Sequence, residues 1–149
     1  MALGLKRKQN PAFVYNMLSD GELGEGSTWE AVMSAVQWKL DNLIAIVDFN
    51  NQQADGPTRA ALAQVPEAAK WQAFGWHAQE VDGNDLDAVV AAFDAARSHD
   101  GAQPRVIICN TTMCKGIPFL ERREITHFVR VEPEEWAMAL EILDGEIPQ

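Results

Sequence analysis

Residues 12–30 have the sequence AFVYNMLSDGELGEGSTWE, in which an apolar run, a glycine-rich segment and the start of a helix follow one another. The apolar run at residues 12–18 has the length and composition of a buried strand. Ser27, with Glu30 three residues later, has the spacing of a capping box, which predicts that a helix begins there. The glycines before the helix allow backbone N–H groups to approach an anion closely. This stretch therefore predicts a strand, an anion-binding loop and a helix.

Strand-like and helix-like segments alternate through the rest of the chain. Strand candidates lie at residues 43–49, 76–81 and 105–110, and helical spacing appears at residues 27–40, 58–74 with an interruption at Pro66, 85–98 and from Pro133 onward. The last helix carries Trp136 and Leu140 on one face, and packing roles are expected for the tryptophans. The segments 50–57 and 111–131 are expected to be irregular. The alternating order predicts one α/β domain over residues 1–149, a parallel sheet with helices on both faces.

The composition excludes several classes of function. The formal net charge is −10 at pH 7, so the chain lacks the basic surface that nucleic-acid binding requires. The longest uninterrupted apolar run, residues 43–47, is too short to span a membrane. At residues 1–8 the charged residues follow the apolar ones, the reverse of a secretory signal, so we expect a cytoplasmic protein without membrane attachment. Cys109 and Cys114 are expected to be reduced thiols.

Two polar side chains follow the first two predicted strands. Asp20 lies just beyond residues 12–18, and Asn50 directly follows residues 43–49. Neighbouring parallel strands end at the same edge of a sheet, where ligands bind, so we expect these side chains to lie near each other. A carboxylate and an amide oxygen suit Mg²⁺ or Ca²⁺, and the glycines and the helix start suit a phosphate. The residues thus indicate a metal-bridged phosphate site, with simple Asp-Gly and Asn-Asn turns as the alternative.

The same stretch resembles a known family. Residues 19–26, SDGELGEG, continuing through Trp29-Glu30-Ala31, resemble the thiamine-diphosphate motif of transketolases, which begins Gly-Asp-Gly and closes with an asparagine. Here Asn50 stands at the family's spacing from Asp20. The similarity continues at residues 40–48, 55–58, 70–77 and 81–83, and it fades after residues 115–119. The resemblance implies a thiamine-diphosphate-binding fold, with thiamine diphosphate and Mg²⁺ (or Ca²⁺) as cofactors.

The resemblance implies a role for each residue of the motif. Asp20 and Asn50 would bind the metal through their side-chain oxygens, and Gln52 would add its main-chain carbonyl. Gly21 would let the backbone approach the diphosphate, and Glu22 beside it is counted among the cofactor-binding residues. These positions form the diphosphate and metal half of the family's site.

Two further residues are implied as catalytic. Glu25 matches a family glutamate near the subunit interface that takes part in communication between sites. His127 falls where transketolases carry a histidine that contacts the diphosphate and the substrate. The sequence departs from the family at Ser19, where the motif has Gly, and at Phe128, where His-Gly is usual. A preceding lysine-glycine repeat is reduced to residues 114–116, so a changed donor or acceptor preference is expected.

The resemblance also implies partner chains. Transketolases place the residues that contact the pyrimidine ring on a separate domain, and they carry an upstream segment with substrate-binding histidines; this sequence matches neither. We therefore expect a split enzyme, active only in a hetero-oligomer with a pyrimidine-binding subunit and a chain that supplies the upstream segment. It would transfer a two-carbon ketol unit from a ketose phosphate, a sugar phosphate substrate, to an acceptor. A fragment of a longer chain is the alternative to a natural short subunit.

Other functions stay open at this point. A component similar to the E1 of 2-oxoacid dehydrogenases, loading a lipoyl group or a carrier protein, would use the same Asp20 and Asn50. A non-catalytic assembly module would keep the fold without the chemistry. A nicotinamide-binding domain is excluded, because no Gly-x-Gly-x-x-Gly turn follows the first strand. His77 and His99 are interpreted as structural. Residues 122–123, two arginines, are interpreted as solvated, with substrate-phosphate binding as the alternative.

Overall fold

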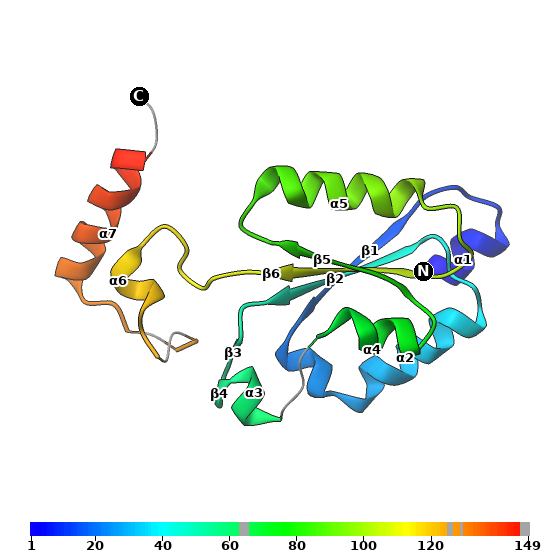
Figure 1. The fold of residues 1–149 in the computed structure, drawn as a ribbon, viewed down its shortest axis with the longest axis horizontal. Helices are drawn as coiled ribbons and strands as arrows, with labels where there is room; N and C mark the ends of the chain where they lie inside the picture. The colour runs from blue at the N-terminus through cyan, green and yellow to red at the C-terminus, as the bar shows by residue number, and fades with distance from the viewer. Residues whose placement is uncertain (63–65, 125–126, 129, 147–149) are drawn as a thin grey trace.

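The computed structural model describes residues 1–62, 66–124, 127–128 and 130–146, and its centre is a four-stranded parallel sheet (Figure 1). The strands are β1 (Val14–Ser19), β2 (Leu43–Phe49), β5 (His77–Asp82) and β6 (Arg105–Asn110), in the spatial order β1-β2-β6-β5. Residues 43–47 and 106–108 are apolar without interruption, as strands covered on both faces require. The predicted α/β fold with a parallel sheet is confirmed.

Helices cover both faces of this sheet (Figure 1). α2 (Gly26–Gln37) and α4 (Ala68–Ala73) pack on one face, and α5 (Leu86–Ser98) packs on the other. The remaining elements are α1 (Ala2–Arg7), the 3-10 helix η1 (Gly21–Gly24), α3 (Thr58–Ala61), α6 (Pro118–Glu121), α7 (Pro133–Glu146) and the short antiparallel strands β3 (Gln52–Gln53) and β4 (Gly56–Pro57). Pro66 lies between α3 and α4, as predicted, and α6 is a helical turn within a segment predicted to be irregular.

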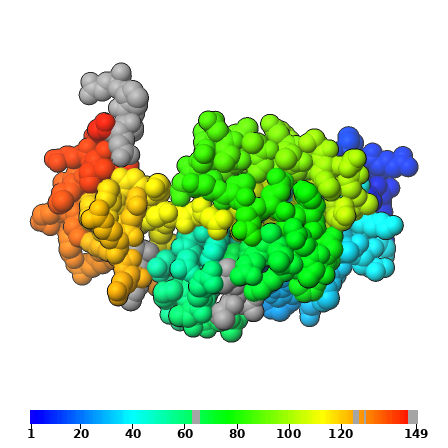
Figure 2. Space-filling view, in the orientation of Figure 1, coloured from blue at the N-terminus to red at the C-terminus, as the bar shows by residue number. Residues whose placement is uncertain are grey.

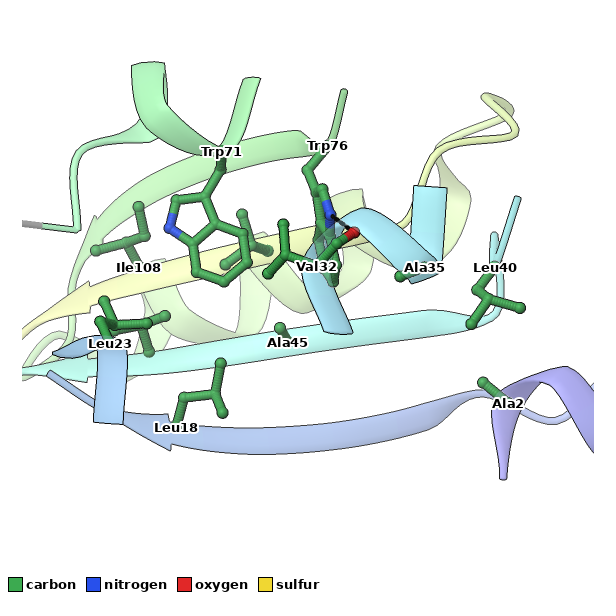
Figure 3. Close-up of a cluster of buried hydrophobic side chains, with 12 residues drawn as sticks. Ala2, Leu18, Leu23, Val32, Ala35, Leu40, Ala45, Trp71, Trp76 and Ile108 are labelled. Carbon is green, nitrogen blue, oxygen red and sulfur yellow. Dashed lines mark hydrogen bonds between the residues drawn. The ribbon is translucent and has the colours of Figure 1, made fainter. Parts of the chain in front are cut away.

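Alternate residues of β2 and β6 build one core against α2 and α4 (Figure 3). Trp71 and Trp76 are both buried there, and their rings meet edge to face with centroids 5.1 Å apart. Trp76 Nε1 donates a hydrogen bond to the carbonyl of Val32 in α2 at 3.1 Å. This bond ties the start of β5 to α2, and the two indoles bury more apolar area than aliphatic side chains would. The buried strand side chains in this core are Leu18, Ala45, Val47, Val106 and Ile108.

The opposite residues of the same two strands build a second core beneath α5. Ile44, Ile46, Ile107 and Cys109 face this helix, which buries Ala92 and Ala96 against them. α5 begins after Asp85, whose carboxylate accepts hydrogen bonds from the backbone N–H groups of Asp87 and Ala88. Such an N-cap satisfies donors that have no partner inside the helix. The cap thus sets where α5 starts above the sheet.

The predicted burial of the first strand is wrong. β1 lies at the edge of the sheet, and Leu18 is its only fully buried side chain. Tyr15 and Met17, which point to the side occupied by α5, are 46% and 63% exposed. α5 packs on the central strands and contacts β1 through Phe93, whose ring lies 5.8 Å from that of Tyr15. An edge strand with one covered face cannot be buried, whatever its composition.

α6 and α7 lie beyond the carboxyl ends of the strands (Figures 1 and 2). α7 starts at Pro133 as predicted, but its predicted packing face is exposed: Trp136 is 55% and Leu140 is 58% accessible. The reason is its position, because α7 does not cover the sheet. An ion pair between Arg123 and Glu135 ties α7 to the segment after α6. No helix within the described ranges has the length and apolar character needed to cross a membrane.

His77 and His99 stack on each other at the amino end of the sheet. Their ring centroids are 3.9 Å apart and their planes differ by 15°. Arg105, at the start of β6, is buried beside them and donates from Nη2 to the carbonyl of His99 at 2.5 Å. Burial lowers the pKa of His77, and the nearby His99 and Arg105 lower it further. This pair lies at the end of the sheet away from Asp20 and Asn50, in line with the structural role predicted for it.

Candidate functional site

The turn after β1 is held by a capping box formed by Ser19 and Glu22, whereas the predicted capping box was at Ser27 and Glu30. Ser19 Oγ accepts a hydrogen bond from the N–H of Glu22 at 3.1 Å, and Glu22 Oε2 accepts one from the N–H of Ser19 at 3.3 Å. Ser27 does not play the predicted capping role, because α2 begins at Gly26 after Glu25 and has no side-chain cap. These two bonds hold the turn that leads into η1, whose N-cap is Asp20, while α2 has no side-chain cap. Ser19, which replaces the family's glycine, is not among the described residues with positive φ.

Asp20 is a buried carboxylate at the carboxyl end of β1. Its side chain is 2% exposed, and its backbone N–H donates to the carbonyl of Asp48 at 3.2 Å, which continues the β1–β2 pairing. Oδ1 accepts a hydrogen bond from the N–H of Gly21 at 2.8 Å, and Oδ2 accepts one from the hydroxyl of Thr58. Two donors thus hold both oxygens of a carboxylate that is shielded from water.

The loop after β2 folds back as a small hairpin. Asn50 Oδ1 accepts a hydrogen bond from the N–H of Gln52 at 2.9 Å, and Asn51 has a φ of 59°. β3 and β4 then pair, with Gln53 opposite Gly56, whose φ of 118° favours glycine. An asparagine side chain that bonds to the backbone two residues on is a common way to set such a turn. The side-chain oxygen of Asn50 is thereby held at the end of β2.

Thr58 joins the two loops. It is fully buried at the start of α3, its hydroxyl donates to Asp20, and its backbone N–H donates to the carbonyl of Asn51 at 3.2 Å. The side chain of Gln53 also lies over Gly21, because a Cβ placed on Gly21 would be 3.7 Å from it. The structure therefore brings the turn after β1 and the loop after β2 together, as the strand order predicted.

A cavity of about 560 Å³ opens at the same edge of the sheet, on the side of α5. Asn50 lines it, together with Asp48, Gly83 and Thr111. Thr111 Oγ1 donates to Asp48 Oδ1 at 2.5 Å. Cys109 forms part of the wall, and burial, with the Asp48 carboxylate beside it, raises the pKa of its thiol. Asp48 is the one charged side chain among the described residues that line this cavity, and most of the others are apolar.

The two residues predicted as catalytic lie at the surface. Glu25 is exposed directly before α2. His127 is exposed, and its ring meets that of Phe128 edge to face at 4.8 Å. The segment that carries His127 is connected to the candidate site through Gln52, whose Nε2 donates to the carbonyl of Glu124 at 3.1 Å. Both predicted catalytic side chains are therefore open to other molecules.

The oxygens near Asp20 and Asn50 fit a hard divalent cation. No three His, Cys, Asp or Glu side chains cluster as a metal site within the described ranges, so such a site would depend on one carboxylate with amide and carbonyl oxygens. Carboxylate, amide and carbonyl oxygens are the donors that Mg²⁺ and Ca²⁺ prefer. Gln52 Oε1 is buried without a hydrogen-bond partner in the described part of the chain, so the loop also holds an unsatisfied acceptor. Asp20, Asn50 and Gln52 thus offer oxygen donors of the types that such a cation would use.

Comparison with known proteins identifies the fold and the family. A family model for the thiamine diphosphate binding domain of transketolase matches residues 7–144, most of the chain. The chain belongs to the transketolase family. Its resemblance to transketolases at residues 19–26 and beyond is confirmed. Because the matching model is that of transketolase, the E1-like, carrier-loading and non-catalytic alternatives are not favoured.

Two transketolase relatives and one solved transketolase show how much of a complete enzyme the chain covers. A transketolase family protein of Sinorhizobium fredii is 61% identical over 145 residues, 97% of this chain and 52% of that protein. A 6-deoxy-6-sulfo-D-fructose transketolase subunit of a Clostridium species is 38% identical over 146 residues, 98% of this chain and 53% of that one. The crystal structure of Campylobacter jejuni transketolase has the same fold, with a TM-score of 0.70 and 24% identity over 97% of this chain and 28% of that one. The chain thus spans about half the length of these two relatives and 28% of the Campylobacter jejuni transketolase.

Thr58 is the site residue that the sequence reasoning missed. It lies in residues 55–58, a segment that contributed to the resemblance to transketolases, but its type and position indicated only the start of a helix. Its acceptor, Asp20, is far away in sequence. Burial of a threonine hydroxyl requires an acceptor, and only the folded structure reveals which one.

Proposed function

We propose that this chain supplies the diphosphate- and metal-binding half of a thiamine-diphosphate-dependent transketolase. The reaction would transfer a two-carbon ketol unit from a ketose phosphate to an acceptor. The observation that carries the proposal is Asp20, a buried carboxylate after β1 that is bonded to the loop containing Asn50 and lies within the family match. The proposal includes the cytoplasmic location expected from the sequence.

Each motif residue has a proposed task. Asp20, Asn50 and the main-chain carbonyl of Gln52 would hold Mg²⁺ (or Ca²⁺), which neutralises the diphosphate in a chain of net charge −10. Gly21 and Glu22 would lie against the diphosphate through their backbone. The N-terminus of α2 adds a favourable partial positive charge near an anion. Thiamine diphosphate supplies the carbanion chemistry when bound, and the chain orients it.

The exposed residues Glu25 and His127 would complete the site together with other chains. Glu25 lies before α2 with no cap bond of its own, so its carboxylate is available to a neighbouring subunit. His127, whose ring is exposed, would contact the diphosphate and the substrate. Exposure of both side chains supports roles at an interface or toward substrate.

The activity would require a second chain with the pyrimidine-binding domain, and a chain with the upstream segment. The relative from the Clostridium species is named as a transketolase subunit, which supports an activity that depends on more than one chain. Residues 1–149 would then act as one domain of a hetero-oligomer. A lipoyl group or a carrier protein as acceptor is not part of this proposal.

The test is a calorimetric titration of thiamine diphosphate with Mg²⁺ into the complex isolated through a tag on this chain. The chain alone and the Asp20→Ala complex serve as comparisons. We expect metal-dependent binding in the complex and its loss in Asp20→Ala, followed by turnover of a ketose phosphate but not of a 2-oxoacid. A folded complex that binds no thiamine diphosphate would refute the proposed function.

A further inference from the structure

The hydroxyl of Thr58 is buried and donates a hydrogen bond to one carboxylate, that of Asp20. Thr58 is fully buried, although threonine is mostly found exposed, and Asp20, which accepts its hydrogen bond, is also buried. The residue before it, Pro57, is the N-cap of α3 and makes no side-chain cap bond. The hydroxyl of Thr58 therefore serves Asp20 and does not cap its own helix.

The bond from Thr58 fixes how the Asp20 carboxylate is turned. The N–H of Gly21, the next residue, donates to Oδ1, and the hydroxyl of Thr58, at the start of α3, donates to Oδ2. A carboxylate oxygen has two lone pairs, so each oxygen keeps one free for a cation. With both oxygens held, the plane of the carboxylate is set before any cation arrives.

Thr58 is also bonded to the loop after β2, which carries Asn50, the second predicted metal ligand. Its backbone N–H donates to Asn51, and Asn50 next to it is held by the N–H of Gln52. The two predicted ligand side chains, Asp20 and Asn50, thus have their orientations set from residues 50–58. One buried threonine connects them.

We propose that Thr58 is a positioning residue for the divalent cation, acting through Asp20. The proposal rests on the proposed function, in which Asp20 is a metal ligand. Removing a group that hydrogen-bonds to a metal ligand and orients it commonly weakens metal affinity by about 10- to 100-fold. A threonine that only fills space beside α3 would leave metal affinity unchanged when its hydroxyl is replaced by a methyl group.

The experiment compares Thr58→Val, which keeps the shape and loses the hydroxyl, with Thr58→Ser, which keeps the hydroxyl and loses the methyl group. Mg²⁺ is titrated calorimetrically into the isolated complex with thiamine diphosphate in excess. We expect Thr58→Val to raise the Kd for Mg²⁺ by about 10-fold or more and Thr58→Ser to stay close to the wild-type complex. An unchanged Kd in Thr58→Val, with binding intact in the wild type, would overturn this inference and leave the proposed function standing.

A measurement on the wild-type complex covers the case in which Thr58→Val does not fold. Hydrogen exchange of a peptide spanning residues 50–62 is followed with and without Mg²⁺. We expect slower exchange of the Thr58 N–H, which donates to the Asn51 carbonyl, when Mg²⁺ is present, because cation binding to Asp20 stabilises the loop bonded to it. Exchange that does not respond to Mg²⁺, in a complex that binds Mg²⁺ by calorimetry, would overturn the positioning role. Absence of Mg²⁺ binding in the wild type would overturn the proposed function, and the inference with it.

Discussion

Ser19 and Glu22 bond to each other in both directions, side chain to backbone, at 3.1 and 3.3 Å. Ser19→Ala leaves the N–H of Glu22 without its acceptor and is expected to lower the free energy of unfolding by about 1 kcal/mol. Ser27→Ala is the matched control, since α2 has no side-chain cap, and its effect should stay within about 0.5 kcal/mol. Urea unfolding of both variants measures the difference. Equal losses would contradict the capping role of Ser19.

Gly83 lines the cavity next to Asn50 and has no room for a side chain. A Cβ at this position would lie 2.5 Å from Thr111 Cγ2 and 2.8 Å from Cys109 Cβ. Gly83→Ala is therefore expected to destabilise the fold by about 1–3 kcal/mol through overpacking. Gly4→Ala, in α1 with nothing within 4 Å of the new Cβ, should be neutral or slightly stabilising. Thermal unfolding of the two variants separates these outcomes, and a neutral Gly83→Ala would show that the cavity wall yields.

The two cysteines should react at different rates. Cys109 is buried, and burial together with the Asp48 carboxylate raises the pKa of its thiol, so little thiolate forms near neutral pH. Cys114 is half-buried in the segment after β6. We expect iodoacetamide to modify Cys114 faster, by roughly tenfold or more, with peptide mass spectrometry as the readout. Cys109→Ser should leave the modification of Cys114 unchanged. Comparable rates at both sites would mean that the α5 side of the cavity opens readily.

The His77–His99 stack should make the fold sensitive to acid. The pKa of His77 is lowered in the folded chain, while in the unfolded chain it is about 6.5. Between these two values the unfolded state binds more protons, so stability falls as the pH drops below about 6.5 and levels off below the folded-state pKa. His77→Phe should remove this loss, and His127→Asn, at an exposed ring, should not. Urea midpoints between about pH 7.5 and 5.5 provide the test, and parallel profiles for wild type and His77→Phe would count against it.

Strand and helix positions could be predicted wherever local pattern and environment agree. β2 and β6 are continuous apolar runs at the centre of the sheet, and α5 has both apolar spacing and an aspartate cap. β1 has a similar composition, yet Tyr15 and Met17 are exposed. Strand composition does not reveal whether a strand lies at an edge or which helices cover it. The same limit applies to α7: its apolar spacing correctly predicted a helix, but the face expected to pack, with Trp136 and Leu140, is exposed.

Only part of the candidate site could be predicted, because some of its bonds join distant segments. The position of Asp20 and Asn50 at neighbouring strand ends follows from the order of strands. The bond from Thr58 to Asp20 does not, since no spacing rule connects a threonine at the start of one helix with a distant carboxylate at the end of a strand. The capping box shows a related ambiguity: Ser19-x-x-Glu22 and Ser27-x-x-Glu30 have the same pattern, and only the backbone geometry selects the first.

The strand order has a consequence for how the chain folds during synthesis. Among the four strands of this sheet, β6 is the last to leave the ribosome, yet it lies between β2 and β5. Until it emerges, β5 has no neighbouring strand and β2 has one open edge, so the four-stranded sheet is completed only when Arg105 pairs with both Ile44 and His77. A nascent chain that stalls before this point exposes apolar strand edges, which are templates for aggregation and targets for chaperones.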